Sequence, residues 1–78
     1  MKEFISLKNV KNVRLYDNGL KVWLDIHYFD KEDGIFFEFR LGDINQDSKD
    51  YIIRKCEEAY IKIKNALIVK QDFVEVEL

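Results

Sequence analysis

Hydrophobic and polar residues alternate along three consecutive stretches of the chain, and this period of two predicts β-strands at about residues 10–17, 20–29 and 35–41. The three glycines of the chain stand at the ends of these stretches, where turns favour them. Short connections between consecutive strands are typical of hairpins. We therefore expect a three-stranded antiparallel meander.

After Gly42 the spacing of hydrophobic residues becomes that of a helix, which we expect at about residues 48–66. The apolar face of this helix carries Ile52, Cys56, Ala59, Tyr60, Ile63, Ala66 and Leu67. Asp47, followed by Asp50, resembles a capping arrangement at the helix start. The apolar face can cover one face of the meander, which we call the inner face; the opposite one is the outer face.

Residues 73–78 alternate again and predict a last strand, which would lie parallel to the first or third strand if it joined the same sheet. Lysines along the first strand would protect its edge from pairing, which slightly favours a place for the last strand beside the third strand. Residues 4–7 form either an extension of the first strand beyond a bulge or a separate segment. We expect one small α+β domain over residues 1–78, of order βββαβ, with one long helix packed on one sheet face.

The dipeptide Asn18-Gly19 is a strong hairpin signal, because both central residues of a type I′ turn need positive φ. This turn sets the pairing of the first two strands. The expected pairs are Val13 with Leu24 and Leu15 with Val22 on the inner face, and Arg14 with Trp23 and Tyr16 with Lys21 on the outer face.

A four-residue loop at 31–34 sets the pairing of the second hairpin. The expected pairs are Leu24 with Leu41, Ile26 with Phe39 and Tyr28 with Phe37 inside, and Asp25 with Arg40, His27 with Glu38 and Phe29 with Phe36 outside. A register one step away would place Asp25 against Glu38, and like charges directly opposite are destabilising. We therefore prefer the first register.

The outer face is rich in aromatic side chains for a surface that faces water. The candidate binding residues on it are Trp23, Phe36, Phe29, Arg14, Tyr16, Arg40, His27 and Glu38. Residues 4–7 or the tail around Phe73 could cover this face internally. Alternatively it binds a protein, since Trp, Tyr and Arg are enriched at binding hot spots, or it stacks single-stranded nucleic acid.

Composition narrows the class of protein. The 78 residues are 47% hydrophobic and 36% charged, which is ordinary for a globular domain. No apolar run reaches the length of about 20 residues that a membrane span needs, and the N-terminus lacks a signal peptide, so we expect a cytoplasmic protein without a membrane partner. The single Cys56 cannot form an internal disulfide.

Charge is unevenly distributed. Residues 1–24 carry five basic and two acidic side chains, whereas residues 25–50 carry three basic and eight acidic ones. This asymmetry is unlike that of a general nucleic-acid binder. The alternative is an accessory protein that binds nucleic acid through a local basic strip, formed by Lys8, Lys11, Arg14 and Lys21.

Residues capable of catalysis or metal binding are few. Cys56 lies on the helix face toward the inner side and His27 points outward, so the two cannot form a dyad or share a zinc ion. Residues 43–47 have the spacing that opens an EF-hand loop, but Ser48 and Arg54 stand where that loop needs Gly and Glu. We expect no enzyme activity, no metal and no cofactor.

The expected function is therefore binding to a protein. Small, proline-free proteins with residues typical of AT-rich genomes are common among phage and mobile-element products that block a host enzyme. The most concrete hypothesis is an inhibitor of this anti-defence type that binds a host protein through the outer face and the acidic residues 30–33 and 43–50. The remaining alternative is a homodimer whose sheets pack back to back.

Overall fold

The computed structural model describes residues 2–77 and contains five strands and one long helix. The elements are β1 (Lys2–Ser6), β2 (Val10–Asp17), β3 (Lys21–Tyr28), β4 (Gly34–Arg40), α1 (Gln46–Ile68) and β5 (Phe73–Glu77). The expected α+β fold is confirmed: β2, β3 and β4 form the antiparallel meander, followed by the helix and a C-terminal strand.

Residues 2–6 form a strand of their own, β1, which pairs antiparallel with β5 in a separate two-stranded sheet. The last strand therefore does not join the sheet of the meander, and the slight preference for a place beside the third strand is wrong. The β1–β5 pair extends beyond both strands, because the Leu7 N–H donates to the Asp72 carbonyl at 2.9 Å. Asn9, in the left-handed region at φ 65°, then redirects the chain into β2.

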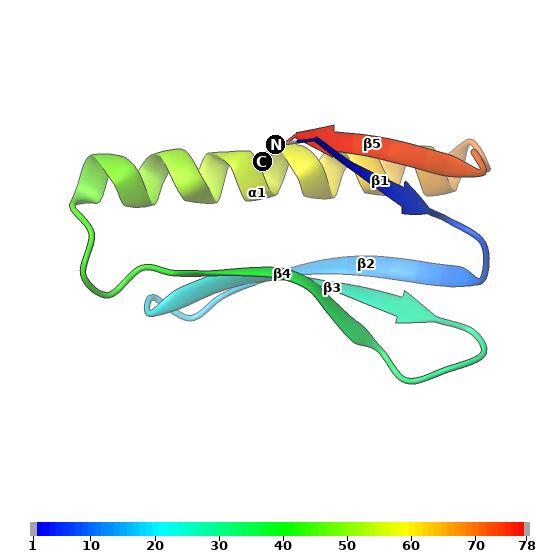
Figure 1. Ribbon diagram of the computed structural model, residues 1–78, viewed down its shortest axis with the longest axis horizontal. Coiled ribbons are helices and arrows are strands. Elements are labelled where there is room, and N and C mark those ends of the chain that lie inside the picture. The colour runs from blue at the N-terminus through cyan, green and yellow to red at the C-terminus, as the bar shows by residue number, and fades with distance from the viewer. Residues whose placement is uncertain (1, 78) are drawn as a thin grey trace.

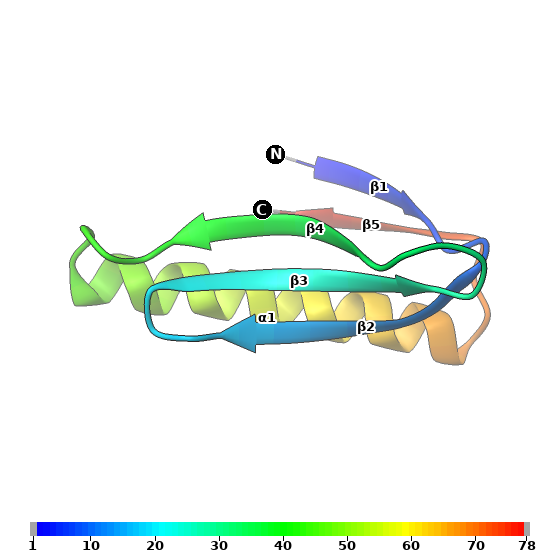
Figure 2. The same ribbon diagram turned by 90° about the horizontal axis from the view of Figure 1, so that it is seen from below.

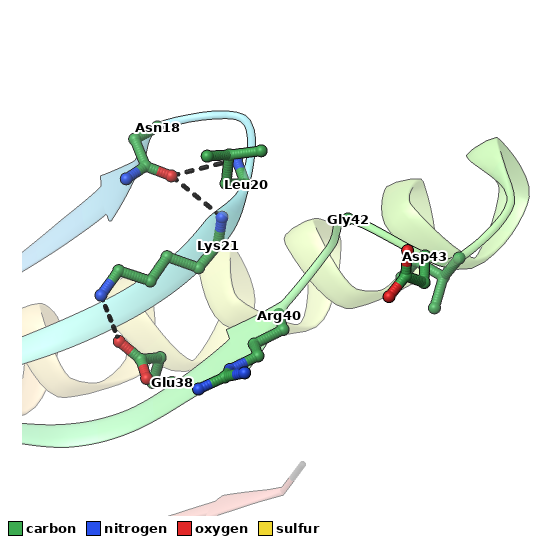
Figure 3. A pocket seen from close by; sticks show the side chains of 8 residues that line it. Asn18, Leu20, Lys21, Glu38, Arg40, Gly42 and Asp43 are labelled. Atoms are coloured by element: carbon green, nitrogen blue, oxygen red, sulfur yellow. Dashed lines mark hydrogen bonds and ion pairs between the residues drawn. The ribbon is translucent and has the colours of Figure 1, made fainter.

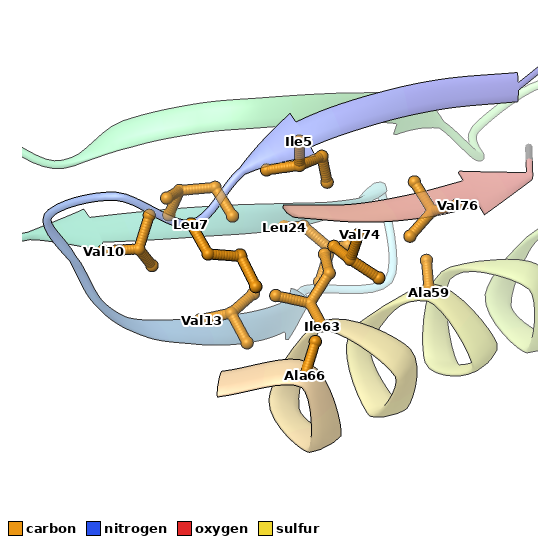
Figure 4. Close-up of a cluster of buried hydrophobic side chains, with 11 residues drawn as sticks. Ile5, Leu7, Val10, Val13, Leu24, Ala59, Ile63, Ala66, Val74 and Val76 are labelled. Carbon is orange, nitrogen blue, oxygen red and sulfur yellow. The ribbon is translucent and has the colours of Figure 1, made fainter. Parts of the chain in front are cut away.

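The domain has two layers (Figure 1): the meander forms one, and α1 with the β1–β5 pair forms the other. Aliphatic side chains from both layers meet between them (Figure 4) and include Ile5, Val13, Leu24, Ile63 and Val74, each at most 6% exposed. The apolar face expected for the helix is confirmed, with Cys56, Ala59, Ile63 and Ala66 buried.

The helix is longer at both ends than its apolar pattern predicted. Asn45, and not Asp47, is the N-cap, and its Oδ1 accepts from the Ser48 N–H at 2.8 Å. At the other end the Gln71 N–H donates to the Ala66 carbonyl, with Lys70 in the left-handed region at φ 59°. This is a Schellman-type helix end, which sends the chain back toward β5.

The pairing of β2 with β3 differs from the expected register by two residues. Arg14 lies opposite Asp25, Leu15 opposite Leu24, and Tyr16 opposite Trp23. Within the turn only Gly19 has positive φ, at 85°, so the turn is not type I′. Asn18 stays at the strand end, where its Oδ1 accepts from the N–H groups of residues 20 and 21.

The pairing of β3 with β4 is displaced by four residues, so that Lys21 lies opposite Arg40, Trp23 opposite Glu38 and Leu24 opposite Phe37. Two contacts account for the longer connection. The Asp33 carboxylate accepts from the Tyr28 N–H and contacts His27 Nδ1. Residue 29 bonds to the Asn9 carbonyl instead of pairing with Phe36.

Both displacements are even in number, so the residues of the regularly paired parts, 12–17 of β2, 21–24 of β3 and 37–40 of β4, keep their expected faces. A bulge interrupts the β3–β4 pairing after Leu24, because Asp25 pairs with Ile35 and leaves Phe36 as the extra residue. Phe36 then packs against the core cluster together with Phe37. The expected position of Phe36 on the outer face is therefore wrong.

Candidate functional site

Within residues 2–77, no helix or strand covers the outer face of the meander (Figure 2). The segment that could have covered it lies on the opposite side: Ile5 and Leu7 belong to the core cluster with Leu24. Phe4 and Phe73, the other candidates for a cover, contact each other on the β1–β5 pair. An internal cover of the outer face by residues 4–7 or by the tail around Phe73 is therefore ruled out in the part of the chain that is described.

Two half-buried aromatic side chains stack on the outer face near the turn between β2 and β3. The rings of Tyr16 and Trp23 are 5.3 Å apart between centroids and inclined by 20°. Lys21 Nζ lies 5.1 Å from the Trp23 ring centroid and 2.8 Å from a Glu38 carboxylate oxygen. The ring, the cation and the carboxylate thus hold one another in place at a site that water reaches.

Two arginines lie on either side of this stack. Arg14 precedes Tyr16 by two residues on β2, and a hydrogen bond with the Tyr16 side chain raises the pKa of the Arg14 guanidinium. Arg40 lies directly opposite Lys21. We call Arg14, Tyr16, Lys21, Trp23, Glu38 and Arg40 the outer-face cluster.

The placement of Arg40 opposite Lys21 is electrostatically unfavourable, since like charges across a strand pair repel. Glu38 relieves this repulsion for Lys21 through its ion pair. Within residues 2–77, Arg40 has no carboxylate within ion-pair distance. The cluster therefore offers a cation that an external carboxylate can neutralise.

An open pocket of about 400 Å³ adjoins the cluster where β4 ends (Figure 3). Its lining includes Lys21, Glu38 and Arg40 from the cluster, together with residues of the 18–20 turn and residues 42–44. Leu20 supplies an apolar wall and is 71% exposed. The pocket thus combines two cations, one apolar wall and the carboxylates of Glu38 and Asp43.

Three residues expected at the site lie outside the outer-face cluster. Phe29 is 73% exposed in the loop after β3, and Phe36 faces the core. His27 lies opposite Asn12 and contacts Asp33, not Glu38, because the register is displaced. The structure thus brings together Arg14, Tyr16, Trp23, Glu38 and Arg40 from the expected set.

The β1–β5 pair carries a second exposed aromatic pair that the sequence did not single out as a surface. Phe4 and Phe73 are 67% and 60% exposed, with ring centroids 6.1 Å apart. The alternation of both segments could have revealed this surface. It places Phe4 on the side of β1 away from the buried Ile5, and Phe73 on the side of β5 away from the buried Val74.

The groups with potential for chemistry are separated. Cys56 is 0% exposed in the core, and burial raises the pKa of its thiol to about 11. No three His, Cys, Asp or Glu side chains of residues 2–77 lie close enough to form a metal site. In the loop at residues 43–47, whose spacing resembles that of an EF-hand, Asn45 serves as the N-cap of the helix. The helix α1 is too polar to cross a membrane.

Searches of protein-family models, curated proteins and solved structures return no match to this chain. Function therefore has to be inferred from the site itself.

Proposed function

We propose that this domain is a non-catalytic protein-binding module and that the outer-face cluster is its contact surface. The observation that carries the proposal is the stacked Tyr16–Trp23 pair on a sheet face that no helix or strand of the described residues covers. Trp, Tyr and Arg are the residues most enriched at binding hot spots. Here all three types lie within one cluster, and their side chains contribute little to the core.

The charges of the cluster favour an acidic partner surface. Asp25 lies opposite Arg14, and Glu38 forms an ion pair with Lys21. Within residues 2–77 no carboxylate lies within ion-pair distance of Arg40. A partner that places a carboxylate near Arg40 and an apolar or planar group on Trp23 would match both features. Electrostatic complementarity of this kind chiefly raises the association rate and the specificity.

The most concrete form of the proposal is an inhibitor encoded by a phage or mobile element, acting in the cytoplasm by covering a functional surface of a host protein. It is supported by the residue usage of the chain and by the binding surface on an otherwise simple scaffold. The acidic loops take a lesser part than the sequence indicated. Asp30 bonds to Asn9, and Asp33 closes the β3–β4 loop.

The test compares three immobilised baits in nuclease-treated lysate of a low-GC bacterium: the wild type, Trp23→Ala and Phe73→Ala. Phe73 is a matched control because it is an exposed aromatic residue outside the cluster. We expect one protein to be retained by the wild type and by Phe73→Ala and lost from Trp23→Ala. Trp23 is the only tryptophan, so its fluorescence then gives the affinity for the purified partner.

Equal capture by all three folded baits would contradict the proposal. So would an unfolded Trp23→Ala, since Trp23 would then be part of the core. A titration with single-stranded oligonucleotide tests the alternative of nucleic-acid stacking. Quenching of Trp23 that weakens steeply with salt would replace the protein-binding proposal by that alternative.

A further inference from the structure

The strand β4 is the outermost strand of the meander, whose order is β2-β3-β4. One side of its backbone bonds to β3, and within residues 2–77 no strand pairs with the other side. The β1–β5 pair lies in the layer of the helix, and the C-terminal half of β4 extends past it (Figure 2). This half of the strand therefore presents an open hydrogen-bonding edge.

The residues whose backbone groups face this edge can be identified. The Leu41 N–H donates to the Leu20 carbonyl at 2.8 Å, so residue 41 points toward β3. Backbone groups alternate in direction along an antiparallel strand. Phe39 therefore also points toward β3, whereas Glu38 and Arg40 point both their N–H and C=O groups toward the open edge.

The other edges of the domain carry the usual protection against pairing. The edge of β2 is protected by the irregular pairing at Lys11 and by the charged side chains of Arg14 and Asp17. The β1–β5 pair carries four charged side chains. By contrast, β4 has the sequence Gly-Ile-Phe-Phe-Glu-Phe-Arg, with one acidic and one basic residue. Its bulge at Phe36 leaves residues 37–41 as the regular part.

The regular part of β4 is complementary to itself. If two copies lie antiparallel with Phe39 opposite Phe39, Glu38 of each copy faces Arg40 of the other. Arg40, which faces Lys21 in the monomer and has no carboxylate within ion-pair distance among residues 2–77, would then receive one. Both Glu38–Arg40 pairs would be of the hydrogen-bonded type, since these residues point their backbone groups outward.

We propose that a second copy of this chain binds along the edge of β4 in this two-fold antiparallel arrangement. The two meanders become one continuous sheet with both helices on the same side. Phe39 of each copy, half-buried in the monomer, gains the other as a neighbour at the inner face. Tyr16 and Trp23 stay exposed on the outer face. The dimer therefore leaves the aromatic part of the outer-face cluster free, although Glu38 and Arg40 belong to both proposals.

Sedimentation equilibrium over about 1 µM to 1 mM tests this arrangement. We expect the wild type to approach twice the monomer mass of 9.4 kDa with rising concentration. Glu38→Arg and Arg40→Glu each place like charges in both cross-chain pairs, so each should weaken dimerisation at least about 100-fold. Mixed together, the two variants regain opposite charges in both pairs and should form a one-to-one heterodimer.

The heterodimer shows at the same time that both variants are folded. Arg40→Pro is a second breaker of the dimer, because it removes an N–H that faces the open edge and is not used within the chain. A wild type that stays monomeric at every concentration would overturn the proposal. A mixture without heterodimer, or a dimer lost in Trp23→Ala but kept in Arg40→Pro, would also overturn it.

Discussion

Consecutive residues of β3 contribute to two surfaces with different roles. Val22, Leu24 and Ile26 point to the inner face and are at most 2% exposed, whereas Lys21 and Trp23 point outward and keep contact with water. The inner residues are aliphatic and meet the helix layer. On the outer side, Trp23 stacks on Tyr16, and Lys21 lies over the Trp23 ring and forms an ion pair with Glu38.

This difference indicates where stability and binding reside. Burial of aliphatic side chains provides most of the stabilisation of a domain of this size, and the net free energy of unfolding is small. The outer aromatic residues bury only part of their surface and are left available for a partner. Substitutions on the two faces should therefore separate loss of folding from loss of binding.

The largest expected effect comes from the inner face. Leu24→Ala removes a fully buried side chain and should lower the free energy of unfolding by about 3 kcal/mol. Urea unfolding followed by circular dichroism measures this loss. Trp23→Ala is the comparison on the same strand and should cost about 1 kcal/mol, the scale of an aromatic pair. Equal losses in the two variants would show that the outer face belongs to the core.

The next effect is pH-dependent and also arises from the inner face. Burial raises the pKa of the Cys56 thiol from 9.0 to about 11, with a smaller contribution from Glu57. The folded chain keeps this proton more strongly, so its contribution to stability is complete below pH 9 and is lost as the pH rises toward 11.

The wild type should therefore lose more stability than Cys56→Ala between pH 8 and pH 10.5, by about 2 kcal/mol. The lysines and tyrosines titrate in both proteins, so their contribution to stability cancels when the two pH curves are compared. Urea midpoints at each pH measure the difference. Parallel curves would mean that the thiol ionises equally easily in the folded and unfolded chain.

The two faces were predictable from the sequence even though the strand partners were not. Alternation assigns a residue to a face, and this assignment survives any displacement of the register by an even number of residues. Trp23, Glu38 and Arg40 therefore face outward as expected, although each has a different neighbour. The prediction that Phe36 faces outward was wrong because an extra residue at the bulge reverses the alternation.

The registers depended on contacts that alternation cannot reveal. The carboxylate of Asp33 closes the β3–β4 loop, and the bond from Phe29 to Asn9 ties that loop to a distant turn. The pairing of β1 with β5 joins the two ends of the chain. Both short segments alternate as strands do, but their pattern does not say which strand is the neighbour.

A smaller effect tests whether the outer face acts as a unit. In a double-mutant cycle, Tyr16→Ala and Trp23→Ala should be coupled by about 1 kcal/mol, because the stacked rings lose the same contact in either variant. Circular dichroism in urea gives the four free energies. The protein concentration must be low, since a dimer would add stability of its own. Additive losses would mean that the rings do not stack in solution.

The smallest effect concerns the ion pair beside this stack. Lys21 and Glu38 are 2.8 Å apart, but their side chains are 41% and 33% exposed, so water screens the attraction. The coupling of Lys21→Ala with Glu38→Ala should be about 0.5 kcal/mol and should fall further in 1 M salt. Lys55 and Glu58, whose charged atoms are 3.8 Å apart, give a matched control with weaker coupling. A Lys21–Glu38 coupling above about 2 kcal/mol would place this pair out of reach of water and remove the contrast between the two faces.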